Sequence, residues 1–259
     1  MIKIIFSDID WTIFDHSKHP SRFDMPSIRM LKRLQKRGAI IFLCTARPYH
    51  SVKQTKILDL IKPDGLIAAN GGIIFYRNEI IYCDKIDAKD FEKLCEVAVK
   101  YKSNVEGVRP YDAFIINDNY DDMSKLFETY PEEVPPIEDY HHQDVIGANL
   151  FVKEEYDELI KNECPFLKYY YRYHPHGVDI ANVIHDKGVA VKMVLDHLGF
   201  KKEEAIAYGD DLQDIAMFNE VGYSVALENA KEEVKKAASY VSKSVTKHGV
   251  KKSLKQLFR

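Results

Sequence analysis

The sequence predicts an α/β protein in which a doubly wound, Rossmann-like parallel sheet is interrupted by an inserted α+β cap domain. Three observations predict this class. Apolar runs alternate with helical patterns at the start of the chain, and this alternation returns near Asp186. The segment between contains both helical and strand patterns that do not follow the alternation. A chain of 259 residues is long enough for a core domain that carries a substantial insertion.

The first part of the chain has the pattern of a parallel sheet. Runs that are apolar on both faces, as in strands covered by helices on each side, lie at residues 2–6, 39–44 and 66–69. Pro26 begins a helical pattern that ends at Gly38, and residues 49–60 have the pattern of a second helix. The order strand, helix, strand, helix, strand predicts parallel pairing.

The middle of the chain has a different pattern. After Asn70-Gly71-Gly72, two short apolar runs flank Arg77-Asn78 and predict a β-hairpin. The next segment is long enough to bury a small core of its own. Its expected helices are residues 88–101 and 154–162, and its expected strands are residues 113–117, 149–152 and 169–173. We therefore expect a cap domain of residues 84–182, inserted in a core domain of residues 1–83 and 183–259.

The parallel-sheet pattern returns in the last part of the chain. Asp186 is the expected N-cap of a helix that ends at Gly199. A strand at residues 205–208, a helix from Leu212 and a short strand at residues 223–225 follow. We expect these elements to complete the core domain.

Composition excludes several classes of protein. Lys and Arg number 37 against 40 Asp and Glu, and the net charge of −3 argues against a nucleic-acid partner. The four cysteines lie far apart without a C-x-x-C pair, so we expect neither a disulfide nor a zinc site. The N-terminus has neither signal-peptide nor transit-peptide character, and no apolar run approaches membrane-spanning length. We expect a cytoplasmic protein without a membrane partner; the pattern leaves its oligomeric state open.

Two carboxylates follow the first expected strand. Asp8 and Asp10, with Thr12 beside them, stand at its carboxyl end, where open α/β sheets bind ligands. Carboxylates two residues apart can face one crevice, so that one attacks while the other donates and removes a proton. A turn in which both aspartates cap backbone groups explains this motif alone at least as well.

Three further features stand at strand ends or helix starts. Thr45 ends the second strand, where its hydroxyl can bind a phosphoryl oxygen or cap the next helix. Lys187 lies in the first turn of a helix, where a cation opposes the helix dipole, so either a nearby anion explains it or the lysine is simply solvated. Residues 209–214, Gly-Asp-Asp-Leu-Gln-Asp, place three carboxylates after a strand, where they begin a helix or bind a cation such as Mg²⁺. The whole set favours phosphoryl transfer, because it supplies a nucleophile, a metal site and charged groups for the phosphoryl oxygens.

These motifs resemble those of a known superfamily. Asp8-Ile9-Asp10-Trp11-Thr12, Thr45, Lys187 and Gly209-Asp210-x-x-x-Asp214 are similar, in this order, to the four motifs of the haloacid dehalogenase (HAD) superfamily. The resemblance covers nearly the whole chain and is strongest to the Cof-type branch of sugar-phosphate and cofactor phosphatases, which has a large α/β cap. Smaller similarities are Ala69-Asn70-Gly71-Gly72, Val178-Asp179-Ile180, Leu227-Glu228-Asn229-Ala230 and His248-Gly249-Val250.

The resemblance implies a magnesium-dependent phosphatase that acts on small soluble phosphate esters through an aspartyl phosphate. Asp8 would be the nucleophile and a Mg²⁺ ligand, and Asp10 the general acid/base, with its backbone carbonyl on the metal. Thr45 and Lys187 would hold the phosphoryl group. Asp210 would complete the protein ligands of the metal, and Asp214 would support them.

Two residues depart from the family pattern. Trp11 stands where Gly is usual, and Gln213 stands where the Cof-type motif usually has Asn. Angles that Gly tolerates cost Trp about 1 kcal/mol or more, so the loop either keeps negative φ or is strained. The Trp11 side chain either packs in the core or forms a wall of the substrate pocket. Asn70, and Arg172 in the aromatic run 168–174, are further candidate substrate contacts, although such runs are ordinary in strands.

Other functions fit parts of the pattern. A phosphotransferase or sugar-phosphate mutase would use the same scaffold with another acceptor. A phospho-accepting signalling module shares an acidic pocket, a Thr and a Lys, but would be about half as long and lack Asp10. A dehalogenase would lack Asp10 and would not need the acidic cluster. The cap histidines are expected at the surface rather than in a metal site: His141, His142, His174 and His176.

Overall fold

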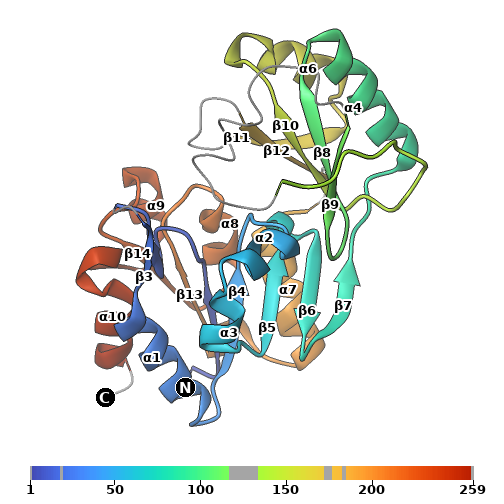
Figure 1. Cartoon of the computed structure of the whole chain (residues 1–259). Coiled ribbons are helices and arrows are strands. Elements are labelled where there is room, and N and C mark those ends of the chain that lie inside the picture. The colour runs from blue at the N-terminus through green and yellow to red at the C-terminus, as the bar shows by residue number, and fades with distance from the viewer. Residues whose placement is uncertain (1, 18–19, 117–133, 172–176, 183–184, 258–259) are drawn as a thin grey trace. The chain divides into compact units, whose positions relative to one another are not determined.

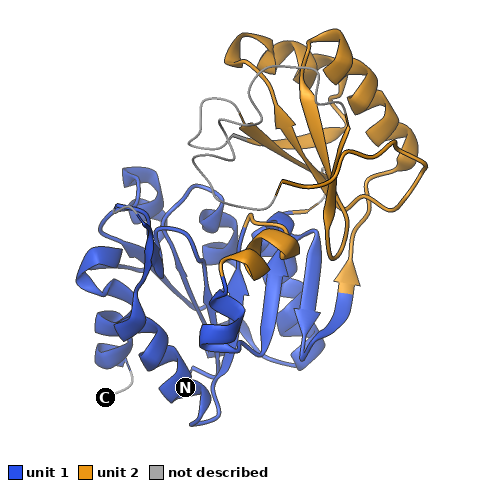
Figure 2. Ribbon diagram, viewed as in Figure 1, with its two compact units in different colours: residues 1–45, 56–81, 186–259 blue, residues 46–55, 82–185 orange. Residues whose placement is uncertain are grey.

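The chain folds into two compact units (Figures 1 and 2). The computed structural model describes residues 2–17, 20–116, 134–171, 177–182 and 185–257. Unit 1 comprises residues 1–45, 56–81 and 186–259, and unit 2 comprises residues 46–55 and 82–185. The expected cap, residues 84–182, falls within unit 2, and residues 46–55 also belong to that unit.

Unit 1 contains an eight-stranded sheet with the order β15-β14-β13-β1-β4-β5-β6-β7. Its strands are β1 (Ile4–Ser7), β4 (Ile40–Cys44), β5 (Gly65–Ala68), β6 (Ile73–Tyr76), β7 (Glu79–Cys83), β13 (Ala205–Gly209), β14 (Tyr223–Leu227) and β15 (Tyr240–Ser242). The six strands from β15 to β5 in this order pair in parallel, and β6 is antiparallel to β5. Strand β1 lies between β13 and β4, and all its residues are buried. The predicted fold class is confirmed.

Helices pack around this sheet in two groups. They are α1 (Met25–Gln35), α3 (Ile57–Ile61), α7 (Lys187–Leu198), α8 (Asp214–Asn219), α9 (Glu232–Ala237) and α10 (Gly249–Leu257). Helix α1 packs against α3 and α10, whereas α8 packs against α7 and α9. Figure 1 shows α3 in front of the sheet and α7 behind it. Short 3₁₀ turns lie at η1 (Ala69–Gly71), η3 (Lys202–Glu204) and η4 (Val245–Lys247).

The helix expected at residues 49–60 is interrupted. It forms two short helices, α2 (Tyr49–Gln54) and α3, because Lys56 between them takes the left-handed conformation with φ of 62°. Helix α2 belongs to unit 2 and α3 to unit 1. The spacing of apolar side chains predicts a helix correctly on each side of Lys56, but it does not indicate the break at Lys56.

Unit 2 has a hydrophobic core of its own. Its five-stranded antiparallel sheet has the order β11-β12-β10-β8-β9. The strands are β8 (Asn104–Val108), β9 (Ala113–Ile116), β10 (Gly147–Phe151), β11 (Leu167–Tyr171) and β12 (Gly177–Asn182), and the helices are α4 (Ala88–Lys100) and α6 (Asp157–Glu163), the latter preceded by η2 (Glu154–Tyr156). Phe91 and Leu94 of α4 share one buried cluster with Val105, Leu150 and Ile180 of the sheet. In the part of the chain that the structure describes, no helix is long and apolar enough to cross a membrane.

A small hairpin follows β1 in unit 1. Strands β2 (Phe14–Asp15) and β3 (Arg22–Phe23) pair antiparallel, and the rings of Phe14 and Phe23 stack with their centroids 4.2 Å apart. Asp10 forms an isolated bridge with Phe14. Through this bridge the hairpin contacts the loop that carries Asp10.

Candidate active site

The predicted site residues of unit 1 lie at one edge of its sheet. Asp8 follows β1, Thr45 follows β4, and Asp210 follows β13. These strands are parallel neighbours, and their carboxyl ends therefore meet at the same edge. Backbone hydrogen bonds continue the ladders to Asp8, whose N–H donates to Tyr208, and to Thr45, whose N–H donates to Ile67.

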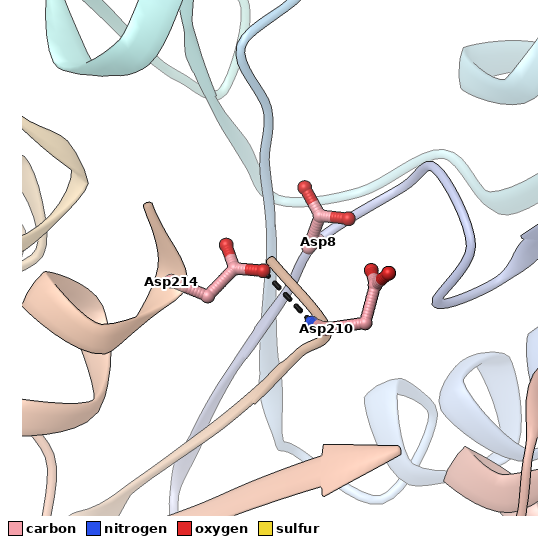
Figure 3. A group of neighbouring side chains, drawn as sticks. All are labelled: Asp8, Asp210 and Asp214. Atoms are coloured by element: carbon pink, nitrogen blue, oxygen red, sulfur yellow. Dashed lines mark hydrogen bonds between the residues drawn. The ribbon is translucent and has the colours of Figure 1, made fainter. Parts of the chain in front are cut away.

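Three buried carboxylates converge at this edge. Each of Asp8, Asp210 and Asp214 offers an oxygen within 4.8 Å of the others, and Figure 3 shows the three side chains around a common space. Asp8 is 6% exposed and Asp214 is fully buried. Among the described residues, this is the only group of three or more potential metal ligands.

Lys187 joins two of these carboxylates. It is the first residue of α7, and its Nζ lies 2.7 Å from Asp8 Oδ1 and 2.7 Å from Asp214 Oδ1. Asp186 caps the helix by accepting hydrogen bonds from the N–H groups of Gly188 and Val189. A lysine at this position opposes the helix dipole, and the two carboxylates compensate for that.

The charges of this buried cluster do not balance. Burial raises the pKa of Asp8 to about 8, although the charge of Lys187 lowers it. Burial also raises the pKa of Asp210 well above its ordinary value, and the charges of Asp8 and Asp214 add to this. Burial tends to lower the pKa of Lys187, but Asp214 and Asp8 more than offset this and keep the pKa above its ordinary value. One ammonium does not balance three carboxylates, so the donor set fits a divalent cation with oxygen ligands.

Asp214 and Thr12 hold the other acids in place. One oxygen of Asp214 accepts from Lys187, and the other accepts from the backbone N–H groups of Asp210 and Asp211 at 2.9 and 3.0 Å. The Thr12 hydroxyl donates to Asp210 Oδ1 at 3.0 Å. Both oxygens of Asp214 are thus engaged within the protein, which fits a supporting role better than direct ligation.

Asp10 has a different environment from Asp8. Its side chain is 28% exposed, and its Oδ1 lies 2.6 Å from Nε2 of His16. Its carboxylate is nevertheless close enough to Asp8 to contribute to the raised pKa of that residue. The sequence did not single out His16, because a lone histidine six residues beyond Asp10 has no recognisable spacing, and only the β2–β3 hairpin brings the two together.

Trp11 has a strained backbone and a half-exposed side chain. Its φ is 57°, so the Gly-like conformation is kept without Gly, and its carbonyl accepts from Asn229 Nδ2 at 3.0 Å. The side chain is 37% exposed, and the interpretation as a packed core residue is therefore wrong. Its role as a wall of the substrate pocket stays a prediction. Asn229 belongs to one of the quoted family motifs, but no pattern in the sequence indicates its contact with Trp11.

Two other predicted contacts have different outcomes. Asn70 lies in η1, directly after β5; it is 2% exposed, and its backbone N–H donates to the Thr45 carbonyl. Its Oδ1 is buried with no hydrogen-bond partner among the described residues, which suits a ligand that donates a hydrogen bond. Arg172 lies outside the described residues, as do His174 and His176, whereas His141 and His142 are exposed.

Comparisons with known proteins identify the family. The chain matches the model of the haloacid dehalogenase-like hydrolases over residues 5–254. Phosphoglycolate phosphatase 1 of Saccharolobus solfataricus is 26% identical over 259 residues, which cover 100% of this chain and 97% of that protein.

Two solved structures extend the comparison. The HAD phosphatase BT1666 of Bacteroides thetaiotaomicron has a TM-score of 0.87 at 26% identity, over 100% of this chain and 96% of that one. The HAD subclass IIB sugar phosphatase BT4131 has a TM-score of 0.84 at 26% identity, over 99% of each chain. The resemblance seen in the motifs is confirmed: the chain belongs to the haloacid dehalogenase-like hydrolases and is a phosphoric monoester hydrolase of the HAD type.

Proposed function

We propose that this enzyme is a Mg²⁺-dependent phosphatase that hydrolyses small phosphate monoesters, such as sugar phosphates or phosphorylated cofactors, through an aspartyl phosphate on Asp8. The observation that carries the proposal is the contrast between two carboxylates on one loop. Asp8 is buried in contact with Lys187 and beside Asp210, whereas Asp10 is partly exposed and bound to His16. The first environment suits a fixed nucleophile and the second suits a group that exchanges protons.

In the first half-reaction, a carboxylate oxygen of Asp8 attacks the phosphorus. The new bond joins that oxygen to phosphorus, and the bond from phosphorus to the leaving oxygen breaks. Asp10 gives its proton to the leaving oxygen, which departs as an alcohol. Lys187 and the Thr45 hydroxyl hold the phosphoryl oxygens, whose charge is spread over three atoms in the transition state.

In the second half-reaction, Asp10 works as a base. Its carboxylate takes a proton from water while the water oxygen attacks the phosphorus. The bond from phosphorus to Asp8 breaks, which restores the Asp8 carboxylate and releases inorganic phosphate. Asp10 ends the cycle protonated, as it began.

The cation would be held by Asp8 and Asp210, with the Asp10 carbonyl as a further ligand and Asp214 supporting the group. When bound, it would neutralise the buried carboxylates and stabilise charge on the phosphoryl oxygens. Mg²⁺ suits a site whose donors are all oxygens.

The substrate class rests on the relatives. A sugar phosphatase and a phosphoglycolate phosphatase both match along nearly the full chain, and both names describe small, polar phosphate esters. A screen of phosphorylated metabolites in Mg²⁺, read as released phosphate, should find substrates of this size, whereas intact phosphoproteins should not be dephosphorylated.

The mechanism has a direct test with an aryl phosphate. Wild-type enzyme should lose turnover in excess chelator and regain it with Mg²⁺, and rapid quench should trap phosphate on the Asp8 peptide. Asp8→Asn should abolish the covalent intermediate. Asp211→Asn is a matched control, because Asp211 shares the acidic motif but stands outside the three-carboxylate group. Full activity in chelator, or phosphate trapped on another residue, would contradict the proposal.

A further inference from the structure

We propose that His16 is a positioning residue for proton transfer: its hydrogen bond to Oδ1 of Asp10 holds the carboxyl group of Asp10 in one orientation. This inference rests on the proposed role of Asp10 as the general acid/base. It concerns a residue outside the four motifs and a single step, the movement of the proton to and from the leaving group.

The His16 ring is held at both nitrogens. Nε2 lies 2.6 Å from Asp10 Oδ1, and Nδ1 lies 2.9 Å from the hydroxyl of Ser21. A carboxylate oxygen accepts, so Nε2 carries the hydrogen toward Asp10. In a neutral ring, Nδ1 is then the acceptor and Ser21 donates to it. One orientation of the ring satisfies both contacts, and the side chain is only 18% exposed.

Aromatic packing fixes the same orientation. The His16 ring centroid lies 4.4 Å from that of Phe14 and 5.5 Å from that of Trp11. Phe14 in turn stacks on Phe23 across the β2–β3 pair. The hairpin thus acts as a support that presents a hydrogen-bond donor to Asp10.

The contacts of His16 indicate which step of the reaction it affects. Asp8 is held by Lys187, whereas the hydrogen bonds of the His16 ring to described residues go to Asp10 and Ser21. Losing the His16 donor should therefore leave nucleophilic attack intact and disturb only the orientation of the Asp10 carboxyl. Proton transfer depends on that orientation, and a good leaving group needs little protonation. The effect should accordingly depend on the leaving group.

The experiment compares two substrates and four variants. His16→Phe keeps an aromatic ring against Phe14 but removes the donor, and His16→Gln keeps an N–H group at a similar reach. Ser21→Ala removes only the anchor of Nδ1. His197→Phe is the matched control, because His197 lies in the last turn of α7, at the opposite end of that helix from Lys187.

With an alkyl phosphate, His16→Phe should lower kcat by roughly 10- to 100-fold, and His16→Gln should recover most of this. With an aryl phosphate, the rate at which Asp8 is phosphorylated should stay within about twofold of wild type, because that step needs little help from Asp10. Ser21→Ala should also lower kcat for the alkyl phosphate more than the phosphorylation rate with the aryl phosphate, but by a smaller factor. His197→Phe should change neither rate.

Each outcome is decisive. If His16→Phe lowers the rate of Asp8 phosphorylation by the aryl phosphate as much as it lowers kcat for the alkyl phosphate, His16 only stabilises the loop. If kcat for the alkyl phosphate does not fall, Asp10 needs no support. Either result overturns the inference. If His16→Phe does not fold, as judged by circular dichroism, the same comparison is made with Ser21→Ala and His16→Gln. If wild-type enzyme forms no aspartyl phosphate on Asp8, the proposed function fails first, and this failure is visible without any variant.

Discussion

At the scale of single residues, the environment separates two aspartates that the sequence presents as a pair. Asp8 and Asp10 stand on one loop, yet one is buried against Lys187 and the other is bound by His16. The spacing allowed attack and proton transfer by a carboxylate pair, but it did not say which aspartate does which. The assignment came from the family resemblance, and the contacts now supply physical support for it.

Replacing Asp10 should separate the two half-reactions. Asp10→Asn removes the proton donor, an effect typically about 10²- to 10⁴-fold on rate, and leaves Asp8 and Lys187 unchanged. With an aryl phosphate the variant should still be phosphorylated, and the aspartyl phosphate should accumulate because its hydrolysis lacks a base. Mass spectrometry of the quenched enzyme measures this. A variant that never becomes labelled would show that Asp10 is needed for attack itself.

Trp11 offers a test of backbone strain. Its φ of 57° lies in the left-handed region, which costs a residue with a Cβ roughly 1–2 kcal/mol and costs Gly almost nothing. Trp11→Gly and Trp11→Ala both remove the indole and differ only in the Cβ. The Gly variant should be the more stable of the two by about 1 kcal/mol in urea unfolding. Equal stability would indicate that the loop relaxes to negative φ when the indole is absent.

At the scale of elements, two helices set the distance between the charged groups. Lys187 begins α7 and Asp214 begins α8, and the two helices pack against each other. Gly188 makes this approach close, because a Cβ there would lie 2.5 Å from the carbonyl oxygen of Ala216. The ion pair between Lys187 and Asp214 therefore depends on a glycine that takes no part in it.

Gly188→Ala should push α7 away from α8. Overpacking of this kind costs about 1–3 kcal/mol, and a displacement near 1 Å in the site can cost on the order of 10²-fold in rate. Gly199→Ala is the control, because Gly199 has φ of 69° but meets no atom within 4 Å, so that change should cost stability without slowing phosphorylation of Asp8. Rapid-quench rates and unfolding curves measure both effects. Unchanged kinetics in Gly188→Ala would show that α7 can move without displacing Lys187.

The same scale shows where prediction from sequence succeeded and where it could not. The buried strands β1, β4 and β5 are continuous apolar runs, and their pattern is local, so they were found. Strand β8 was not, because Asn104 and Glu106 are polar and Gly107 has no side chain. Its pairing comes from distant partners: Asn149 donates to Glu106 at 2.7 Å, and the Phe114 ring occupies the space above Gly107.

At the scale of the whole molecule, the sequence predicts those residues of the candidate site that directly follow the strands of the sheet. Parallel strands bring their carboxyl ends to one edge, so Asp8, Thr45 and Asp210 could be placed together from their positions alone. His16 and Asn229 could not, because a hairpin and a distant loop bring them to the site. Such contacts have no signature in spacing, since they depend on how the chain returns to the sheet.

The charge of the site should couple the stability of the whole fold to pH and to Mg²⁺. Burial raises the pKa of Asp8 from 3.8 to about 8 when no cation is bound. Between these values the folded chain holds a proton that the unfolded chain has released, so the free energy of unfolding should fall as pH rises from about 4 to 8. Asp210, whose pKa is raised by the same cause, acts in the same direction.

A bound cation should reverse this trend, because it stabilises the ionised carboxylates and competes with their protons. Thermal unfolding in chelator and in Mg²⁺ at pH 5.5 and pH 8.5 tests the coupling: the increase in Tm on adding Mg²⁺ should be larger at the higher pH. Asp8→Asn in chelator serves as the control, since it removes the proton linkage of that residue while the rest of the chain titrates as before. The difference in stability between wild type and this variant should shift against wild type as pH rises. A difference that is constant over the same range would mean that Asp8 is ionised in the folded protein without a cation, with Lys187 alone sufficient to stabilise its charge.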